Sequence, residues 1–354
     1  MRDVATQSGF SPATVSIVLN NAPLARYIAP ATKKRIEDTA KKLGYRPNVM
    51  ARFLRSKRSH SIGVLFFDIT DPFCTLIMRG IENALYQASY LAIFADAHNQ
   101  RNRFERYLEL LLERHVEGLI VVANWLFVDI QLLADLSKRN IPSATIGWEL
   151  PGGGGDNISS VMVDNETGAR LALEHLCHLG HRKIAFIRGP KMLIDSAPRW
   201  RGIQKFAQSA GIEIDPALVV QLPDSLDPNS SFDGGYRYTE ELLEQKKKFT
   251  ALMAFDDLTA LGAIRALTKA GVKVPEQCSV TGFDDVALSS LAAPSLTTVR
   301  QPMEAMGGLA VNIVMEGINA ALEKRDWNVV NQKMNPELVI RDSTRAVSLG
   351  TADD

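Results

Sequence analysis

The sequence predicts an α/β fold with an all-α N-terminal headpiece: a three-helix domain followed by a doubly wound core of two lobes. After Ser61, apolar runs of strand length alternate with amphipathic helical patterns, an order that gives parallel sheets covered on both faces. Residues 1–45 contain only helical patterns separated by turn residues. The length of 354 residues suits two or three domains.

The headpiece, residues 1–45, is expected to form three helices around one small core. The first runs from Arg2 to Gly9. The second begins at Ser11 and Pro12, an N-capping hydroxyl followed by a proline at the first helical position, and ends near Asn20. The third, about Pro30 to Leu43, stops at Gly44. The side chains predicted to form this core are Val15, Val18, Leu19, Ile36, Ala40 and Leu43.

Charge separates the two ends of the chain, although the formal net charge is zero. The first 60 residues contain twelve Lys or Arg against three Asp or Glu, and the remainder contains 28 against 37. A basic end on an acidic body is typical of a separate module that faces a polyanion. Two helices joined by a Gly-containing turn, the second with small outward residues, have the geometry of a DNA recognition motif. The candidate DNA-contacting residues here are Ser11, Pro12, Ala13, Thr14, Ser16, Ile17 and Asn20.

Residues 46–60 are expected to form a hinge helix and linker. The helical segment from Arg46 to Arg55 has basic flanks but is too short to be stable alone in water. We expect it to become ordered only on DNA and against a partner subunit.

The core is expected to contain two successive series of parallel strands, with ligand bound in the cleft at their carboxyl ends. The first series of strands is Ile62–Phe67, Tyr90–Ala97, Gly118–Ala123 and Pro142–Trp148, with helices between them. The second series is Val161–Val163, Lys183–Arg188, Phe249–Phe255 and Ser279–Phe283.

Several separate motifs, in one order and spacing, resemble the lactose-repressor (LacI/GalR) family over essentially the whole chain. They include Asp3-Val4-Ala5, Ser11 to Ser16, Leu43 to Asn48, Asp71-Pro72-Phe73, Leu179 to Ile187, Gly282 to Asp285 and Pro294 to Val299. The resemblance implies a type I periplasmic-binding-protein-like core, a homodimer on double-stranded operator DNA, and a small-molecule effector, expected to be a carbohydrate. Whether the effector releases or strengthens DNA binding stays open.

The resemblance also assigns roles in the hinge. It places Asn48, Ala51, Leu54 and Arg55 on DNA, with Leu54 as a wedge in the central base step of the minor groove; the alternative is a leucine packed only on its dimer partner. At Ile17 many relatives have an arginine, so a bidentate guanine contact is absent here. Met1 lies closer to Asp3 than in most relatives, which predicts either a frayed first helix or a true start further upstream.

Five residues are candidates for the effector pocket. Arg199 and Asp284 match family positions that hydrogen-bond ligand hydroxyls, although Arg199 could lie on the surface and Asp284 could cap a helix. Asp256 replaces a common asparagine and is an acceptor only. Phe73 and Trp148 offer aromatic faces for a sugar ring, with core packing as the alternative.

The strand and helix patterns, together with the resemblance, give the expected domain boundaries. The core spans 61–345, with the N-lobe at about 61–158 plus 292–326 and the C-lobe at about 159–291 plus 327–345. The resemblance implies that the chain crosses between the lobes three times, near Ser159, Leu291 and Trp327. The tail, 346–354, has no leucine heptad, so a dimer is expected rather than a tetramer.

Other classes of protein fit less well. No apolar run was expected to reach the roughly 20 residues of a membrane span, and three dispersed cysteines suggest no disulfide framework; a cytoplasmic location follows. His175, His178 and His181 lack a further ligand at metal spacing and are expected on the surface. We therefore expect no enzyme activity, cofactor or metal. A solute-binding protein of the same two-lobed fold, without a DNA role, is the alternative, which the basic headpiece argues against.

Overall fold

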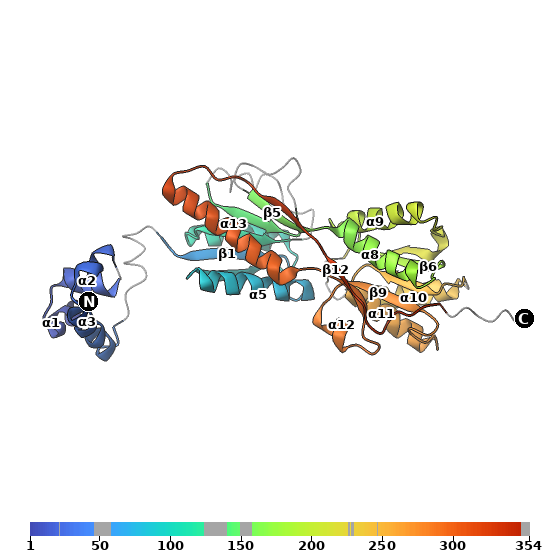
Figure 1. Ribbon diagram of the computed structural model, residues 1–354, viewed down its shortest axis with the longest axis horizontal. Helices are drawn as coiled ribbons and strands as arrows, with labels where there is room; N and C mark the ends of the chain where they lie inside the picture. The colour runs from blue at the N-terminus through green and yellow to red at the C-terminus, as the bar shows by residue number, and fades with distance from the viewer. Residues whose placement is uncertain are drawn as a thin grey trace, which may run out of the picture. The chain divides into compact units, whose positions relative to one another are not determined.

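The computed structural model describes residues 1–20, 22–45, 58–123, 140–148, 158–225, 227, 230–245 and 247–347 (Figure 1). The chain divides into two compact units, Met1–Ser59 and His60–Asp354. The division falls within the linker that the sequence placed at 46–60.

Within residues 1–20 and 22–45, the N-terminal unit contains the three expected helices and one short turn of helix that the sequence did not predict. Its elements are α1 (Arg2–Ser8), α2 (Pro12–Leu19), the 3₁₀ helix η1 (Pro23–Tyr27) and α3 (Pro30–Lys42). Val4, Ala5, Val15, Val18, Ile36 and Ala40 form the core. Leu43, which the sequence placed in this core, is 38% exposed, because α3 ends at Lys42 and the backbone turns there.

The ends of these helices explain their bounds. Gly9 follows α1 with φ of 77°, a left-handed conformation that glycine adopts without steric cost. The hydroxyl of Ser11 accepts a hydrogen bond from the Thr14 backbone N–H at 3.1 Å and so caps α2 as predicted. Met1 stands at the N-cap of α1 and makes no side-chain capping bond.

The core unit contains two six-stranded sheets, one in each lobe. The N-lobe sheet has the order β11-β5-β4-β3-β1-β2, and the C-lobe sheet has the order β12-β10-β9-β8-β6-β7. The N-lobe strands are β1 (Ser61–Phe66), β2 (Leu91–Asp96), β3 (Gly118–Val122), β4 (Ser143–Ile146), β5 (Ile158–Val163) and β11 (Asn331–Met334). The C-lobe strands are β6 (Ile184–Arg188), β7 (Val219–Gln221), β8 (Ala251–Ala254), β9 (Ser279–Asp284), β10 (Thr297–Arg300) and β12 (Glu337–Val339). All the pairings are parallel except that of β10 with β12.

Helices cover the sheets, as in a doubly wound fold. The N-lobe carries α5 (Pro72–Gln87), α6 (Arg101–Glu113) and α13 (Met303–Glu323). The C-lobe carries α8 (Asn165–His178), α9 (Ser196–Ser209), α10 (Ser230–Glu244), α11 (Asp257–Lys269) and α12 (Ala287–Leu291), with the short η2 (Pro216–Leu218) before β7. Helix α13, from the C-terminal part of the chain, packs beside α5 (Figure 1). The two backbones meet at Gly80, where a Cβ would lie 2.0 Å from the Glu304 carbonyl oxygen.

The crossings between lobes lie later in the chain than the resemblance implied. Strand β5 pairs with β4 in the N-lobe, so the first crossing follows Val163 and not Ser159. Strand β10 pairs with β9 in the C-lobe, so the second follows Arg300 and not the region of Leu291. The third lies between β11 and β12, after Met334. An apolar strand pattern does not reveal which sheet the strand joins, and only the pairing decides it.

Helix α13 is an apolar segment of the length of a membrane span, contrary to expectation. By length and composition alone it could cross a membrane. Its apolar side chains are instead used inside the protein: Met306, Ala310, Val311 and Val314 are buried in the N-lobe core, against α5 and the sheet. We therefore assign α13 as a core helix.

Candidate functional site

The first candidate surface is the start of α2 in the headpiece. Ser11, Pro12 and Ala13 are exposed there. Thr14, Ser16, Ile17 and Asn20 are half-buried, and the Asn20 amide donates hydrogen bonds to the Ser16 carbonyl at 2.8 Å and to its hydroxyl at 3.2 Å. The exposed part of the predicted DNA-contacting set is therefore small and uncharged.

Basic side chains accompany this surface on α3. Lys34, Arg35, Lys41 and Lys42 are exposed, and within residues 1–20 and 22–45 no Lys or Arg forms an ion pair. Arg35 lies over the Phe10 ring, 5.7 Å from its centroid. These positive charges are free to contact phosphate groups. The hinge candidates Asn48, Ala51, Leu54 and Arg55 lie outside the described residues.

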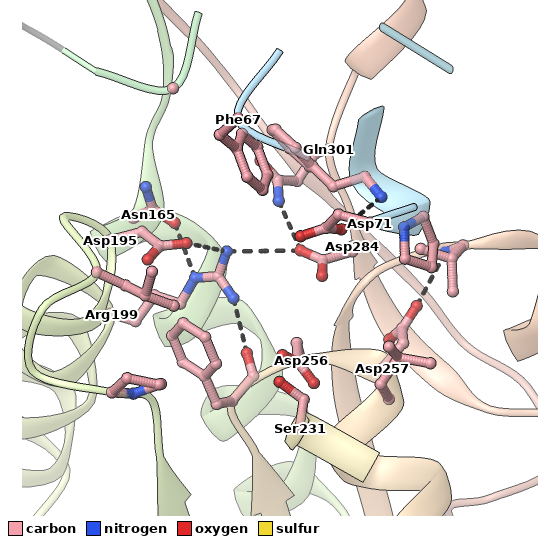
Figure 2. A pocket seen from close by; sticks show the side chains of 18 of the residues that line it. Phe67, Asp71, Asn165, Asp195, Arg199, Ser231, Asp256, Asp257, Asp284 and Gln301 are labelled. Atoms are coloured by element: carbon pink, nitrogen blue, oxygen red, sulfur yellow. Dashed lines mark hydrogen bonds and ion pairs between the residues drawn. The ribbon is translucent and has the colours of Figure 1, made fainter. Parts of the chain in front are cut away.

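The second candidate site is a cleft between the lobes of the core unit (Figure 2). Phe67, Asp71 and Phe73 line it from the N-lobe. Most of the remaining lining comes from the C-lobe. Asn165 lies at the start of α8, after β5 of the N-lobe sheet, and the others follow the carboxyl ends of C-lobe strands: Asp195, Arg199, Phe255, Asp256, Asp257 and Asp284. Four of the five predicted effector residues, Phe73, Arg199, Asp256 and Asp284, thus meet in one cleft.

Arg199, on α9, is the centre of the C-lobe wall. Its guanidinium donates to Asn165 Oδ1 at 2.9 Å and to the Phe255 carbonyl at 2.7 Å, and it forms an ion pair with Asp195 at 2.8 Å. The Phe283 ring packs against it, with the centroid 3.7 Å away. Arg199 is only 6% exposed, so it is a buried cation held by partners rather than a surface arginine.

Asp284, at the end of β9, connects Arg199 to the segment that crosses between lobes. It accepts a hydrogen bond from the Gln301 amide at 2.6 Å and lies 3.5 Å from Arg199 (Figure 2). Burial raises the pKa of Asp284 well above its usual range, while Arg199 acts in the opposite direction. Its φ of 119° is unusual for a residue with a side chain, and such strain is retained where surrounding contacts fix the conformation.

Two further carboxylates cap helices at the cleft. Asp71 accepts from the Phe73 backbone N–H at 2.9 Å at the start of α5. Burial, with the nearby negative charges of Asp256, Asp68 and Asp195, raises the pKa of Asp71 to about 7, against that hydrogen bond. Asp256 accepts from the Thr259 backbone N–H at 2.7 Å and caps α11.

Trp148 does not join the others. Its side chain is 4% exposed and packs with Leu65, Leu119 and other apolar groups on the opposite side of the N-lobe sheet from α5. Only its neighbour Gly147 lines the cleft. Trp148 therefore packs in the core, which was the alternative to a sugar contact. The chain turns at Gly147, which has φ of 83°, just before Trp148.

Sequence reasoning missed several residues of the cleft. Asp195, the N-cap residue of α9, stands four positions before Arg199, a spacing that brings the two side chains to the same face and favours an ion pair. Asp71 lies in the Asp71-Pro72-Phe73 motif, of which only Phe73 was predicted to line the cleft. Gln301 carries no local signal, because its contact with Asp284 depends on the crossing of the chain between lobes.

The histidine trio divides in the structure. His178 is exposed and His175 half-buried, but His181 is 3% exposed, contrary to expectation. Its ring nitrogens hydrogen-bond to the hydroxyls of Thr250 at 2.8 Å and Ser279 at 3.0 Å. His181 therefore joins neighbouring strands of the C-lobe at their N-terminal ends, away from the cleft.

Comparison with known proteins gives the same picture over both units. Residues 1–48 match the family described as bacterial regulatory proteins, lacI family, and residues 173–344 match a periplasmic binding protein-like domain. The chain is 32% identical over 351 residues to the HTH-type transcriptional repressor PurR of Haemophilus influenzae (strain PittEE), covering 98% of this chain and 99% of that protein.

The chain belongs to the LacI family.

Solved structures agree with this assignment. The Lac repressor dimer bound to operator and the anti-inducer ONPF matches with a TM-score of 0.80 and 27% identity, over 97% of this chain and 98% of that one. A complex of the transcriptional regulator CelR with cellobiose matches with a TM-score of 0.70 and 27% identity, over 96% and 98%. The LacI-family chain is thus a helix-turn-helix transcription regulator with a periplasmic-binding-protein-like core, and not an enzyme. A solute-binding role without DNA is not supported.

Proposed function

We propose that this LacI-family regulator represses transcription as a homodimer on operator DNA in the cytoplasm, and that a sugar or sugar derivative in the cleft controls its affinity for the operator. The observation that carries the effector part is the convergence of Phe73, Arg199, Asp256 and Asp284 on one cleft between lobes. Carboxylates accept hydrogen bonds from ligand hydroxyls, and aromatic rings pack on the apolar faces of sugars. Relatives support this, since one is solved with cellobiose and another with ribose.

The DNA part is supported by the headpiece. Exposed cations without acidic partners on α3 lie in the same unit as the small, exposed start of α2. Such cations attract phosphates, whereas contacts to base edges give sequence preference. We propose that Ser11, Pro12, Ala13, Thr14, Ser16, Ile17 and Asn20 face the major groove and that Asn48, Ala51, Leu54 and Arg55 contact the hinge region of the operator.

A homodimer is supported by exposed apolar side chains at one edge of the N-lobe. Tyr86, Leu91 and Phe94 are 73%, 66% and 41% exposed, and they lie on α5 and β2. Strand β2 ends the order of its sheet among the described strands. An apolar, unpaired edge favours burial against a second subunit.

A ligand alters DNA affinity only if it binds the DNA-competent and the incompetent states unequally. Gln301 offers a direct route in this chain, because it contacts Asp284 in the cleft and lies two residues before α13 of the N-lobe. Movement of one lobe on the other would change this contact.

The test is a set of operator titrations at several salt concentrations, with and without a panel of sugars. We expect affinity for one duplex sequence to fall as salt increases and to change with one sugar. Leu54→Ala is expected to weaken specific DNA binding and to leave sugar binding intact. Asp284→Ala is expected to remove the sugar response and to retain DNA binding. A protein without preference for any duplex would contradict the proposal.

A further inference from the structure

The cleft has a marked excess of carboxyl groups over basic groups. Among the described residues that line it, the only basic side chain is that of Arg199. The carboxyl groups that line it are Asp71, Asp195, Asp227, Asp256, Asp257 and Asp284. A ligand that enters therefore meets acceptors and negative potential from both lobes.

Arg199 has little left to offer an anionic ligand. Its Nε donates to Asn165 and its Nη1 donates to the Phe255 carbonyl. Its Nη2 pairs with Asp195, and Asp284 lies 3.5 Å from the same atom. The rings of Phe255 and Phe283 lie against its planar group, at 4.5 and 3.7 Å from their centroids. A phosphate or carboxylate of a ligand would have to displace these contacts.

Several acceptor atoms, in contrast, are left for a donor. Asp195 Oδ1 is buried and has no hydrogen-bond partner among the described residues. Asp71 and Asp256 each use one oxygen as a helix cap. A buried acceptor without a donor is costly, and a ligand donor would remove that cost.

Three of these carboxyl groups line the cleft from different lobes. Asp71 belongs to the N-lobe, whereas Asp195 and Asp256 belong to the C-lobe, and their charges, after burial, raise the pKa of Asp71 to about 7. Carboxylates that repel one another in a partly buried space are stabilised by a positive charge placed between them. The aromatic rings of Phe67 and Phe73 also line this space, and aromatic faces attract cations.

We propose that the effector is a hydroxylated compound that carries a positive charge, in the manner of a protonated amino sugar, bound between Asp71 of one lobe and Asp195 and Asp256 of the other. The inference rests on the proposed effector role of the cleft and narrows its ligand class. A bare metal ion fits less well, because no group of three or more His, Cys, Asp or Glu among the described residues could hold one. Sugar phosphates and sugar acids are disfavoured by the same charges.

The test uses ligands that differ in one substituent. The full-length protein is titrated by calorimetry near neutral pH with glucose, glucosamine and glucose 6-phosphate, and with the corresponding galactose and mannose compounds. We expect at least one amino sugar to bind about tenfold more tightly than its neutral parent and the phosphates to bind more weakly than either. Tenfold corresponds to about 1.4 kcal/mol, which lies within the attraction of opposite charges near a protein surface.

A matched pair of variants links that preference to the cleft. Asp256→Asn retains a good N-cap for α11 and removes one charge, so the amino sugar is expected to lose about tenfold in affinity and its parent to be little affected. Asp326→Asn changes an exposed residue after α13, outside the cleft, and should alter neither affinity.

Three outcomes would overturn the ligand class: tighter binding of a phosphate than of its amino counterpart, no binding by any of the amino sugars, or an unchanged preference in Asp256→Asn. Operator titrations on the same preparation separate this result from the proposed function. An operator response to a neutral or anionic sugar would support the regulator role and contradict the positive charge of the effector.

Discussion

Lys and Arg side chains are unpaired in the described part of the headpiece, whereas several in the core unit form ion pairs. In residues 1–20 and 22–45 no Lys or Arg is paired with an acid. In the core unit, Arg201 and Lys205 both pair with Glu166, and Arg300 and Arg341 both pair with Asp285. Positive charge left without an acidic partner indicates a partner outside the chain, here a polyanion, whereas paired charge is used for structure.

In the cleft the unpaired groups are acidic, whereas in the headpiece they are basic. There the carboxylates outnumber the one arginine among the described lining residues, and Asp195 Oδ1 has no donor. Each unit thus carries an excess of one charge at the surface or cavity where we place its ligand. We expect charged groups that are paired within the protein to contribute to stability, and unpaired groups to contribute to ligand binding.

The largest effect is expected from Arg199→Ala. It leaves Asp195 and Asp284 buried without their cation, and removing one partner of a buried ion pair costs about 3–5 kcal/mol. The loss in free energy of unfolding is measured from the transition of the core unit in urea denaturation. The control is Glu166→Gln, which breaks exposed pairs with Arg201 and Lys205 and should cost about 1 kcal/mol or less. Equal effects of the two variants would show that burial does not distinguish these pairs.

The next effect is a pH dependence that Asp71 introduces. Its pKa is raised from 3.8 to about 7 in the folded protein, so the folded state holds this proton more tightly than the unfolded state. The stability that Asp71 contributes is therefore present at low pH and is lost as pH rises toward 7, by up to about 1.4 kcal/mol per pH unit. Asp71→Asn retains the helix cap and removes the titration.

Free energies of unfolding of both proteins, measured by urea denaturation at several pH values between acid and neutral, check this prediction. The difference between wild type and Asp71→Asn should change steadily over that range. Parallel pH profiles would show that burial and the neighbouring carboxylates do not raise the pKa of Asp71, and this account of the cleft would then be wrong.

The smallest effect is expected from single lysines of α3. Lys34→Gln or Lys41→Gln should lower affinity for all duplex sequences about equally and reduce the salt dependence by about one unit of slope for each lost phosphate contact. Lys205→Gln, an exposed lysine of the core unit paired with Glu166, is the control and should leave DNA binding unchanged. A loss of affinity confined to one sequence would indicate a base contact instead.

Local patterns predicted much of the fold and part of the site. The Ser11–Pro12 start of α2, the helix stop near Gly9 and the alternation of strands and helices follow from neighbouring residues, since caps and periodicity are local properties. Arg199, Asp256 and Asp284 were predicted from the resemblance and Phe73 from its aromatic ring, and all four lie together in the cleft. Their use as contacts to an effector stays a prediction.

The sequence by itself determined the helices and strands, the basic headpiece and the two-lobed fold class. Helix ends, periodicity and local charge depend on residues that are close together in the chain. Only the tertiary structure decided that β5 joins the first sheet and β10 the second, that Trp148 packs in the core, and that Gln301 meets Asp284. Each of these depends on contact between segments distant in sequence. The balance of charge in the cleft is of the same kind, since Asp71 and Asp256 are 185 positions apart and share one space only when the lobes are assembled.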